Sequence, residues 1–335
     1  MFWVWAQFLI CVSFILVFGS RLSRYGDVIG EKTGLSGIWI GLLLLAVVTS
    51  LPELITGISA VTIVGAPDLA LGTAFGSNTF NLLIIALADV LYRKASLFSV
   101  ASKANRALGL WGIVLIAVAG AAIPLSTVWS GAIGWVSAFS LLLVLLYLWG
   151  SRRIARSEAK SASDEQQALR YQGVSTRRAY LGFAVAALVV IGAGTWLAII
   201  GDQIATITGW GETFVGSLLL AAATSLPELV VSVVALRLGA LDMAIANVLG
   251  SNMFNMGIVI AGDDIFYRPG PIFAAVSMEH LIAVAIAIVM TLVVLAGFSF
   301  RFGQRSSLKI SWHSLAIIAI YIAGAYLMFT MRAPL

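Results

Sequence analysis

The chain has 335 residues, of which 61% are apolar and only 10% are charged, and its mean hydropathy is +1.03. Because a soluble domain carries roughly a quarter charged residues, this composition excludes a soluble globular protein and indicates one that crosses a membrane several times. The net charge of +5 comes from Lys and Arg residues that lie between apolar runs, so these residues indicate membrane topology and not a nucleic-acid surface.

The apolar runs predict an all-α polytopic membrane protein with ten transmembrane helices. A polar segment, residues 151–178, separates a first five-helix unit, 1–150, from a second, 179–335. Because so short a segment cannot bury much of a core, we expect it to be a solvated or helical linker. We place the ten spans near residues 2–20, 37–64, 69–91, 107–125, 129–149, 179–200, 212–236, 242–262, 280–299 and 310–330.

The distribution of basic residues predicts the orientation of the chain. If the N-terminus lies outside, 18 of the 20 Lys and Arg residues fall in cytoplasmic segments, and only Arg268 and Arg332 fall outside. Cytoplasmic loops of membrane proteins carry such an excess of positive charge. The sequence therefore predicts a multi-pass protein of the plasma (inner) membrane, with both termini outside and the linker 151–178 in the cytoplasm.

Two distant parts of the chain repeat one another. The segment TGLSGIWIGLLLLAVVTSLPEL, which begins at Thr33, matches TGWGETFVGSLLLAAATSLPEL, which begins at Thr208. A second motif follows each copy, GSNTFN from Gly76 and GSNMFN from Gly250, so the motif helices cover about 37–91 and 212–262. Five predicted spans separate the copies, and this odd number makes the two units inverted. Inverted repeats with interrupted helices are typical of secondary transporters.

Each copy places a proline and a carboxylate inside an apolar helix. Pro52 and Pro227 have no N–H, which leaves the carbonyl oxygen four residues earlier without its usual partner. An ionised carboxylate near the bilayer centre costs ~2.5–3.5 kcal/mol or more. Glu53 and Glu228 therefore need a partner, and intramembrane carboxylates are functional by default.

The polar groups of both motifs offer oxygen ligands only: carboxylates, hydroxyls, amide oxygens and freed carbonyls. Hard cations select such ligands; two carboxylates balance one Ca²⁺, and Na⁺ fits the same oxygens once calcium has left. We expect these ions as substrates and expect no cofactor and no protein partner that the sequence can name. Buried Ser, Thr and Asn residues also form interhelical hydrogen bonds without binding ions, and that alternative stays open for each of them.

Two other classes of protein remain as alternatives. A cation channel uses similar rings of oxygen atoms, but it needs no inverted pair of broken helices. An intramembrane hydrolase needs a base near its serine, and His280 and His313 are far from both GSN motifs in the sequence. We therefore expect no enzymatic activity. Glu279 and His280 start the ninth span, where we expect an interfacial position, with a pH-sensing role as the alternative.

The paired T-S-L-P-E and G-S-N-x-F-N motifs resemble those of the sodium/calcium exchanger branch of the cation/calcium antiporter family. The resemblance covers Thr33–Asp89 and Thr208–Asp264, whereas the rest of the chain matches only in its five-plus-five plan. The G-N-x-x-E motif typical of proton-coupled relatives is absent. The resemblance implies exchange of Ca²⁺ for Na⁺ by alternating access, with the first and sixth spans sliding as a gate. The alternative is an antiporter that couples Ca²⁺ or another divalent cation to H⁺ or K⁺.

The resemblance also implies a set of ion ligands. The carboxylates shared by calcium and sodium are Glu53 and Glu228, and the calcium site is completed by Thr49 and Thr224. The sodium ligands are Ser50, Ser225, Ser77 and Ser251, with backbone oxygens around Ala46 and Ala221. The central position is lined by Asn81 and Asn255.

The chain departs from the family pattern at two pairs of positions. Val48 and Ala223 stand where members usually have Gly before T-S-L-P-E, and Asn81 and Asn255 stand where some exchangers have an acid. The core of the site therefore holds only two carboxylates, which bears on the sodium stoichiometry and on the identity of the driving ion.

Overall fold

The computed structural model describes residues 1–32, 45–92, 96–129, 131–159, 175–237, 239–299 and 310–331. In these residues almost all regular structure is helical, which confirms the predicted class. The long helices are α1 (Phe2–Phe14), α2 (Ser20–Lys32), α5 (Pro67–Leu91), α6 (Lys103–Ser126), α7 (Ala138–Ala159), α8 (Thr176–Thr208), α11 (Leu226–Arg237), α12 (Leu241–Phe254), α15 (His280–Ser299) and α16 (Trp312–Met331). The short ones are α4 (Leu51–Ser59), α9 (Glu212–Val215), α10 (Ala221–Thr224), α13 (Ile260–Phe266), α14 (Ile272–Ala275) and a 3₁₀ turn, η3 (Leu97–Ser99).

Four π-helical segments occur within these helices or at their ends. They are η1 (Ile15–Gly19), η2 (Ala60–Val64), η4 (Gly216–Leu220) and η5 (Asn255–Val259). π-helical turns are rare and occur frequently at functional sites. Here η4 ends four residues before Thr224, the first residue of the second T-S-L-P-E motif, and η5 begins at the last residue of the second G-S-N-x-F-N motif.

The described residues contain eight helices long and apolar enough to cross a membrane, or nine if the bent pair around residue 225 is one span. The predicted span 37–64 lies partly outside the described residues, and its described part holds the shorter apolar helix Leu51–Val64. The prediction of ten spans is therefore confirmed only as a multi-span helical fold. The central part of the predicted linker, 160–174, also lies outside the described residues.

One predicted boundary is wrong. Residues 129–137 do not begin the fifth span, because strands β1 (Ala132–Ile133) and β2 (Val136–Ser137) form a small antiparallel hairpin there. Gly134 turns the hairpin with φ of +66°, a conformation that residues with a Cβ rarely adopt. The fifth span starts at Ala138.

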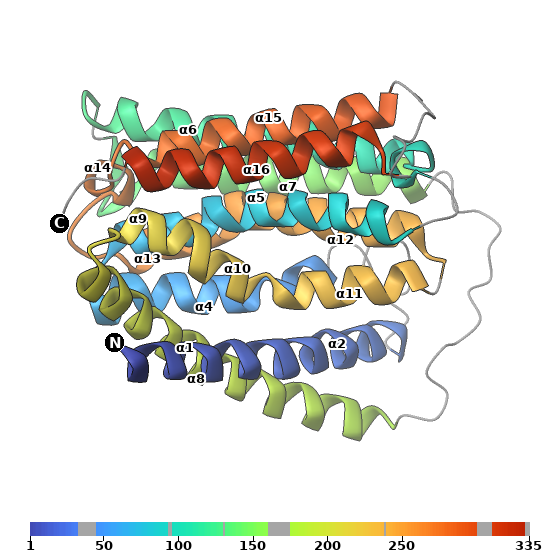
Figure 1. Cartoon of the computed structure of the whole chain (residues 1–335), viewed down its shortest axis with the longest axis horizontal. Coiled ribbons are helices and arrows are strands. Elements are labelled where there is room, and N and C mark those ends of the chain that lie inside the picture. Colours follow the sequence, from blue (N-terminus) through green and yellow to red (C-terminus); the bar gives the residue numbers. More distant parts are fainter. Residues whose placement is uncertain are drawn as a thin grey trace.

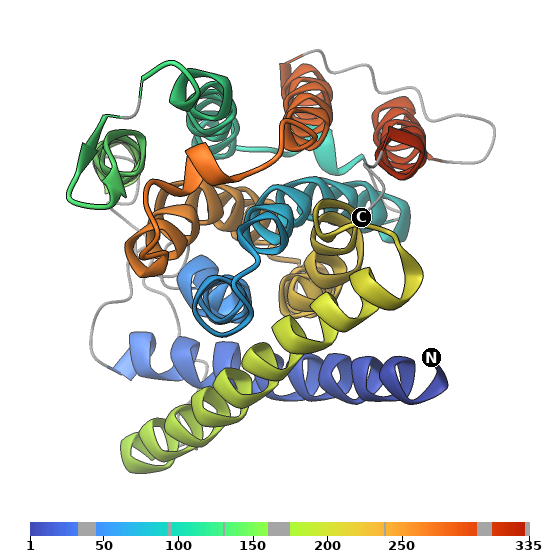
Figure 2. The same cartoon turned by 90° about the vertical axis from the view of Figure 1, so that its left-hand side faces the viewer.

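The helices form layers around the two repeated segments. Figure 1 shows α6, α7, α15 and α16 on one side of the bundle, α5 and α12 next to them, and α4 and α9–α11 beyond. Helices α1, α2 and α8 lie together on the opposite side, where α8 crosses α1 and α2 obliquely (Figure 2). The motif helices therefore lie between an outer layer of four helices and a separate pair formed by the first and sixth predicted spans.

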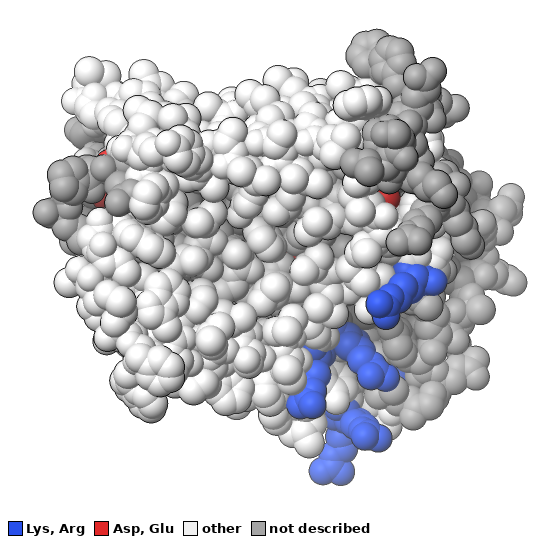
Figure 3. All heavy atoms as spheres, in the orientation of Figure 1, with Lys and Arg blue, Asp and Glu red and all other residues white. Residues whose placement is uncertain are grey.

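Basic side chains gather at one end of the molecule. On the face shown in Figure 3 they lie at the end opposite the N-terminus. Lys32 ends α2, Arg177 and Arg178 lie in the first turn of α8, and Arg237 ends α11, and these helix ends all lie at that end of the bundle.

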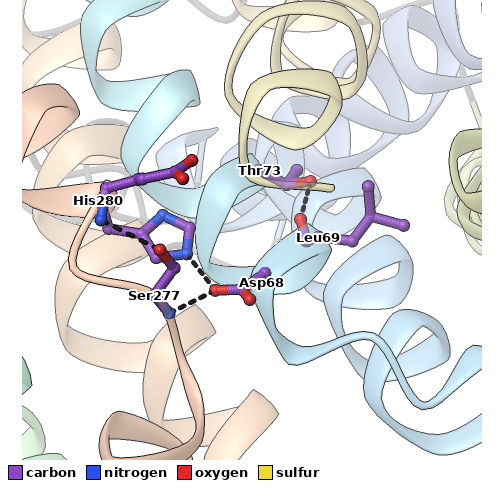
Figure 4. A network of polar contacts seen from close by, with 6 residues as sticks. Asp68, Leu69, Thr73, Ser277 and His280 are labelled. Carbon is purple, nitrogen blue, oxygen red and sulfur yellow. Dashed lines mark hydrogen bonds and ion pairs between the residues drawn. The ribbon is translucent and has the colours of Figure 1, made fainter. Parts of the chain in front are cut away.

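Two aspartates link the motif helices to the outer layer in the same way. Asp68, at the start of α5, accepts hydrogen bonds from the backbone N–H of Ser277 (2.7 Å) and contacts Nε2 of His280 (2.9 Å), as Figure 4 shows. Asp242, at the start of α12, accepts from the backbone N–H of Ser102 (2.9 Å) and from Nδ2 of Asn105 (2.7 Å). In each case the carboxylate holds the beginning of an outer helix, α15 or α6.

The contact with Asp68 holds His280, the first residue of the ninth span, inside the protein. His280 is fully buried and its ring lies 5.8 Å from that of Phe75, whereas Glu279 is partly exposed. The carboxylate of Asp68 supplies the polar partner that the buried ring needs, and the interfacial depth of His280 stays a prediction.

We expect Asp68→Ala and Asp242→Ala each to destabilise the fold by ~1–3 kcal/mol, because each leaves a backbone N–H and a side-chain donor unpaired. Thermal unfolding in detergent, followed by tryptophan fluorescence, measures this loss. Asp202→Ala removes a partly exposed carboxylate from α8 and serves as the control. Melting of both variants at the wild-type temperature would show that these contacts do not stabilise the fold.

Candidate cation-binding site

Both repeated helices break at a serine. Ser50 (φ −88°, ψ 11°) separates the preceding helical turn from α4, and Ser225 (φ −84°, ψ 7°) separates α10 from α11. The prolines two residues later lie in the first turn of the new helix, where their missing N–H is tolerated. The axes on the two sides of Ser225 differ by 41°. The serine and glutamate of each motif thus lie at a bend in the middle of the bundle.

The two motifs exchange hydrogen bonds across the molecule. Ser50 Oγ donates to Glu228 Oε1 (3.0 Å), and Ser225 Oγ donates to Glu53 Oε1 (2.9 Å). Ser77 Oγ, from α5, also donates to Glu53 Oε1 (3.4 Å). Each carboxylate is therefore held by a hydroxyl group of the other broken helix, 172 or 178 residues away in the sequence.

The threonines lie beside the carboxylates and bond to their own helices. Thr49 Oγ1 donates to the carbonyls of Leu45 (3.0 Å) and Ala46 (3.2 Å). Thr224 Oγ1 donates to those of Leu220 (3.0 Å) and Ala221 (3.3 Å). Because each threonine hydroxyl donates to a backbone carbonyl, its oxygen keeps lone pairs for a cation.

A further contact joins the hydroxyl groups of the two halves. Thr49 Oγ1 lies 3.3 Å from Ser251 Oγ of α12. The backbone oxygens of Ala46 and Ala221 accept bonds from the N–H groups of Ser50 and Ser225 (3.1 Å each). Because the same carbonyls also accept from the hydroxyls of Thr49 and Thr224, each has two donors within its own helix, and a cation would have to take the place of one of them.

Four asparagines bridge α5 and α12. Asn81 Nδ2 donates to Asn252 Oδ1 (3.0 Å), and Asn255 Nδ2 donates to Asn78 Oδ1 (3.4 Å). Nδ2 of Asn252 donates to the backbone carbonyl of Asn78 (3.2 Å), and Nδ2 of Asn78 donates to the backbone carbonyl of Asn252 (3.4 Å). Asn78 and Asn252 were not among the predicted site residues, although their place in both G-S-N motifs was a signal that could have found them.

Four acceptor oxygens of the site have no donor among the residues that the structure describes. They are Oε2 of Glu53 and Glu228 and Oδ1 of Asn81 and Asn255. A buried acceptor without a donor is unfavourable, and a buried charge without a partner much more so. The donors of both asparagines point toward Asn78 and Asn252, which leaves the oxygens free to meet a positive charge.

All twelve predicted ligands are buried, each at most 1% exposed. The contacts above place them in neighbouring groups: the serine–glutamate bonds, the Thr49–Ser251 pair, the asparagine bridges, and Thr224 with the backbone of its own helix. The set is Ala46, Thr49, Ser50, Glu53, Ser77, Asn81, Ala221, Thr224, Ser225, Glu228, Ser251 and Asn255. Groups of three or more His, Cys, Asp or Glu side chains that could hold a metal ion do not occur among the described residues, so a cation here relies on neutral oxygens beside the two carboxylates.

Glycines bring the motif helices into backbone contact. A Cβ on Gly72 would lie 3.0 Å from the Thr213 carbonyl and 3.2 Å from the Cα of Gly216, and a Cβ on Gly76 would overlap the backbone of Ser217. Such small-residue crossings are typical of membrane helix interfaces. This crossing places α5, with Ser77 and Asn81, directly beside the helix that carries the second T-S-L-P-E motif.

The first and sixth predicted spans also touch both broken helices through glycines. In α1–α2, Gly19 packs on Pro227, and a Cβ on Gly26 would lie 3.3 Å from Val48. In α8, a Cβ on Gly194 would lie 3.1 Å from Ile55, and a Cβ on Gly201 would lie 2.9 Å from Leu220.

A bundle that crosses the membrane many times around two buried carboxylates defines a class of ion-handling membrane proteins. The family described as sodium/calcium exchanger protein matches residues 3–150 and 178–331. The chain therefore belongs to the sodium/calcium exchanger family, which confirms the resemblance of the paired motifs, and it is a membrane antiporter of the cation/calcium type.

Individual relatives match along most of their length. The inner membrane protein YrbG of Escherichia coli is 28% identical and covers 86% of this chain and 88% of its own. The sodium/calcium exchanger MaX1 of Methanosarcina acetivorans is 26% identical, covering 94% of this chain and 96% of its own. The solved structures of the sodium-calcium exchanger NCX_Mj (TM-score 0.63, 20% identity, 98% and 99% of the two chains) and of YfkE (TM-score 0.69, 19% identity, 97% and 92%) share the fold.

We expect Gly76→Ala to lower the melting temperature by several degrees, because the new methyl group must displace the Ser217 backbone. Gly112→Ala is the matched control: it is also within a membrane helix, and a Cβ there meets nothing within 4 Å. The control should melt at or slightly above the wild-type temperature, because alanine favours a helix over glycine by ~1 kcal/mol. Equal melting of the two variants would contradict a tight crossing at Gly76.

Proposed function

We propose that this protein exchanges Ca²⁺ for Na⁺ across the plasma (inner) membrane by alternating access. The observation that carries the proposal is the group of four buried acceptor oxygens without donors, on Glu53, Glu228, Asn81 and Asn255, where two broken helices meet. Bound cations would supply the positive partners that these oxygens lack, whereas packing alone leaves each of them unpaired.

The charge and the ligand type favour calcium as one substrate. Two carboxylates neutralise one Ca²⁺, and the hydroxyls of Thr49 and Thr224 add neutral oxygens from either side. Once calcium leaves, the two negative charges must be compensated again in a site away from water. Several Na⁺ ions bound to Ser50, Ser225, Ser77 and Ser251 and to the carboxylates supply that compensation, which makes the two ions alternative occupants and couples their movement. The name of the relative MaX1, a sodium/calcium exchanger, agrees with this pair of ions.

The paired contacts support two inverted five-helix units that share the site. Ser50 with Glu228 and Ser225 with Glu53 are counterparts, as are Asp68 with His280 and Asp242 with Asn105. We place the end with basic helix ends in the cytoplasm, so the N-terminus faces outside. In this topology the C-terminus also lies outside, and the linker 151–178 is cytoplasmic.

Alternating access requires part of the molecule to move past the site. Helices α1–α2 and α8 lie together on one side of the bundle (Figure 2) and touch both broken helices through Gly19, Gly26, Gly194 and Gly201. At these glycines the helices lie close to the broken helices, so a movement of α1–α2 and α8 would act directly on both bends. We propose that they form the gate that opens the site to one side at a time.

Coupling to H⁺ or K⁺, or transport of another divalent cation, is the alternative within antiport, and the name of YrbG specifies no coupling ion. A sodium gradient imposed on proteoliposomes should drive uptake of ⁴⁵Ca²⁺. Uptake that ignores the sodium gradient and follows a proton or potassium gradient would favour the alternative, and downhill flux without any exchange would favour a channel. Catalysis is not part of the proposal, since His280 contacts Asp68 and His313 stacks on Phe98.

We expect Glu53→Gln and Glu228→Gln each to abolish calcium transport while the protein still inserts and folds. Each change leaves Ca²⁺ with one carboxylate in a poorly solvated site. Sodium-driven ⁴⁵Ca²⁺ uptake by the purified variants is the measurement, and Glu279→Gln, the same change at a partly exposed position, should transport normally. Near-normal calcium flux in either site variant would show that this carboxylate is not needed for calcium transport.

The neutral Asn255 yields a prediction about stoichiometry. Three Na⁺ ions beside two carboxylates leave the site one charge positive, so either the third ion binds weakly or fewer than three Na⁺ exchange for each Ca²⁺. We expect Asn255→Asp to strengthen sodium binding or to add a proton-sensitive step. The calcium distribution at equilibrium, measured at several sodium gradients in parent and variant, gives the stoichiometry. A three-to-one parent, together with a variant unchanged in sodium and pH dependence, would show that formal charge does not govern the site.

A further inference from the structure

A third carboxyl group lies inside the membrane-spanning part of the protein, outside the ligand set. Asp263, on α13, is fully buried, and neither of its carboxyl oxygens has a hydrogen-bond donor among the described residues. The group lies against Gly57 of α4, where a Cβ would overlap both Oδ1 and Oδ2. A glycine therefore provides the space for this carboxyl group.

Asp263 has no structural role of the kind that its neighbours have. Asp89 accepts a bond from the N–H of Leu97, eight residues later (2.6 Å), and Asp264 accepts one from the N–H of Ile272, also eight residues later (2.7 Å). Asp89 and Asp264 are thus counterparts that hold the chain after each motif helix. In this register Asp263 corresponds to Ala88, so one half has an additional carboxyl group that the other half lacks.

The position of Asp263 relative to the site follows from α4. Gly57 comes four residues after Glu53, so both lie on the same face of this helix, about one turn or ~5.4 Å apart along its axis. Asp263 therefore lies about one turn from the site carboxylate. Helix α13 lies at the end of the bundle that holds the N-terminus (Figure 1), the outer end in our topology.

Among the described residues, the basic side chains on elements packed against α13 lie far from Asp263, whereas acids lie on neighbouring elements. The elements packed against α13 are α4, α5, α7, β2, η2 and η5. Their described titratable side chains are Glu53 on α4, Asp68 and Asp89 on α5, and Tyr147 with Arg152, Arg153 and Arg156 on α7, and Asp264 is the neighbour within α13. The three arginines lie in the last part of α7, at the opposite end of the bundle (Figure 1).

A proton fits this environment better than a metal ion. Calcium takes six to eight oxygen ligands, whereas Asp263 offers two oxygens and forms no metal-type cluster with other described acids. A proton needs one oxygen and removes the buried charge. Intramembrane carboxyl groups without a paired cation characteristically serve in proton relays.

We propose that Asp263 is a proton-binding site that works against calcium at the Glu53–Glu228 pair. When Ca²⁺ occupies the pair, its positive charge one turn away favours the ionised carboxyl group, the O–H bond of Asp263 breaks, and the proton passes to water at the outer end. By reciprocity, ionised Asp263 strengthens calcium binding by the same factor. This inference rests on the proposed calcium site and adds the proton as a second, antagonistic ligand.

Binding of ⁴⁵Ca²⁺ to purified full-length protein, measured in detergent across a pH series, tests the linkage. Proton release on calcium addition is followed with an indicator dye in weak buffer. Wild type should bind calcium more tightly as pH rises. Asp263→Asn, which imitates the protonated group, should bind about tenfold more weakly at high pH and release about one proton fewer. Glu279→Gln should behave as wild type.

Gly57→Ala provides a second variant, since it keeps the acid but fills its space beside α4, and we expect it to weaken the pH dependence as well. Identical binding and proton release in wild type, Asp263→Asn and Gly57→Ala would overturn the proposal. Weaker binding of Asp263→Asn by the same factor at every pH, with unchanged proton release, would overturn it in favour of a bound cation.

A separate readout distinguishes failure of this inference from failure of the proposed function. Infrared difference spectra between low and high pH should contain a protonated-carboxyl band that Asp263→Asn lacks. If wild type binds no calcium, the proposed function fails, and a band lost in the variant still supports Asp263 as a proton site. If the band is the same in both proteins, Asp263 binds no exchangeable proton and the inference fails.

Discussion

The structure depends on how two carboxyl groups are kept in the interior of an apolar bundle. Glu53 and Glu228 are each fully buried, and each takes a hydrogen bond from the serine at the break of the opposite helix. Ser77 of the first half also donates to Glu53, but the serine at each break bonds the glutamate of the other half. The bend at Ser50 therefore serves Glu228 and the bend at Ser225 serves Glu53, and the site exists only where the two bends meet.

The close helix crossings follow from this requirement. The second broken helix lies close against α5, and Gly72, Gly76 and Gly216 allow this backbone contact. The hydrogen bonds among the four asparagines then hold α5 against α12. In Asn81 and Asn255 the amide nitrogen takes part in these bonds, and Oδ1 has no donor among the described residues. In Glu53 and Glu228, in the same way, one carboxyl oxygen takes part in a scaffold bond while the other has no donor in the part of the chain that the structure describes. The residues that form the hydrogen bonds of the scaffold are thus the same residues that carry the acceptor oxygens without donors.

The sequence was sufficient for the parts of the site that rest on local rules. A proline next to a glutamate in an apolar helix marks both bends, and the repeat of both motifs shows which residues share a role. It was insufficient where tertiary contacts decide. The donor direction of Asn78 and Asn252, the pairing of Asp68 with His280 and the free carboxyl group of Asp263 all depend on residues more than 100 positions away or on another helix. The hairpin at 131–137 was missed because its apolar residues resemble the start of a span.

The two halves agree at the centre and differ toward the end that holds the N-terminus. Near the centre the exchanged serine–glutamate bonds have counterparts, so a cation meets similar ligands from either side of the membrane. Toward that end Asp263 stands where the other half has Ala88, and His280 stands where it has Asn105. The first replacement puts a carboxyl group where the other half has an apolar side chain. Exchange of ions needs only the shared centre, whereas a response to protons needs groups that titrate. A duplicated transporter can therefore acquire pH sensitivity on one side of the membrane by changing one copy of the repeat, without altering the ligands that both copies build together.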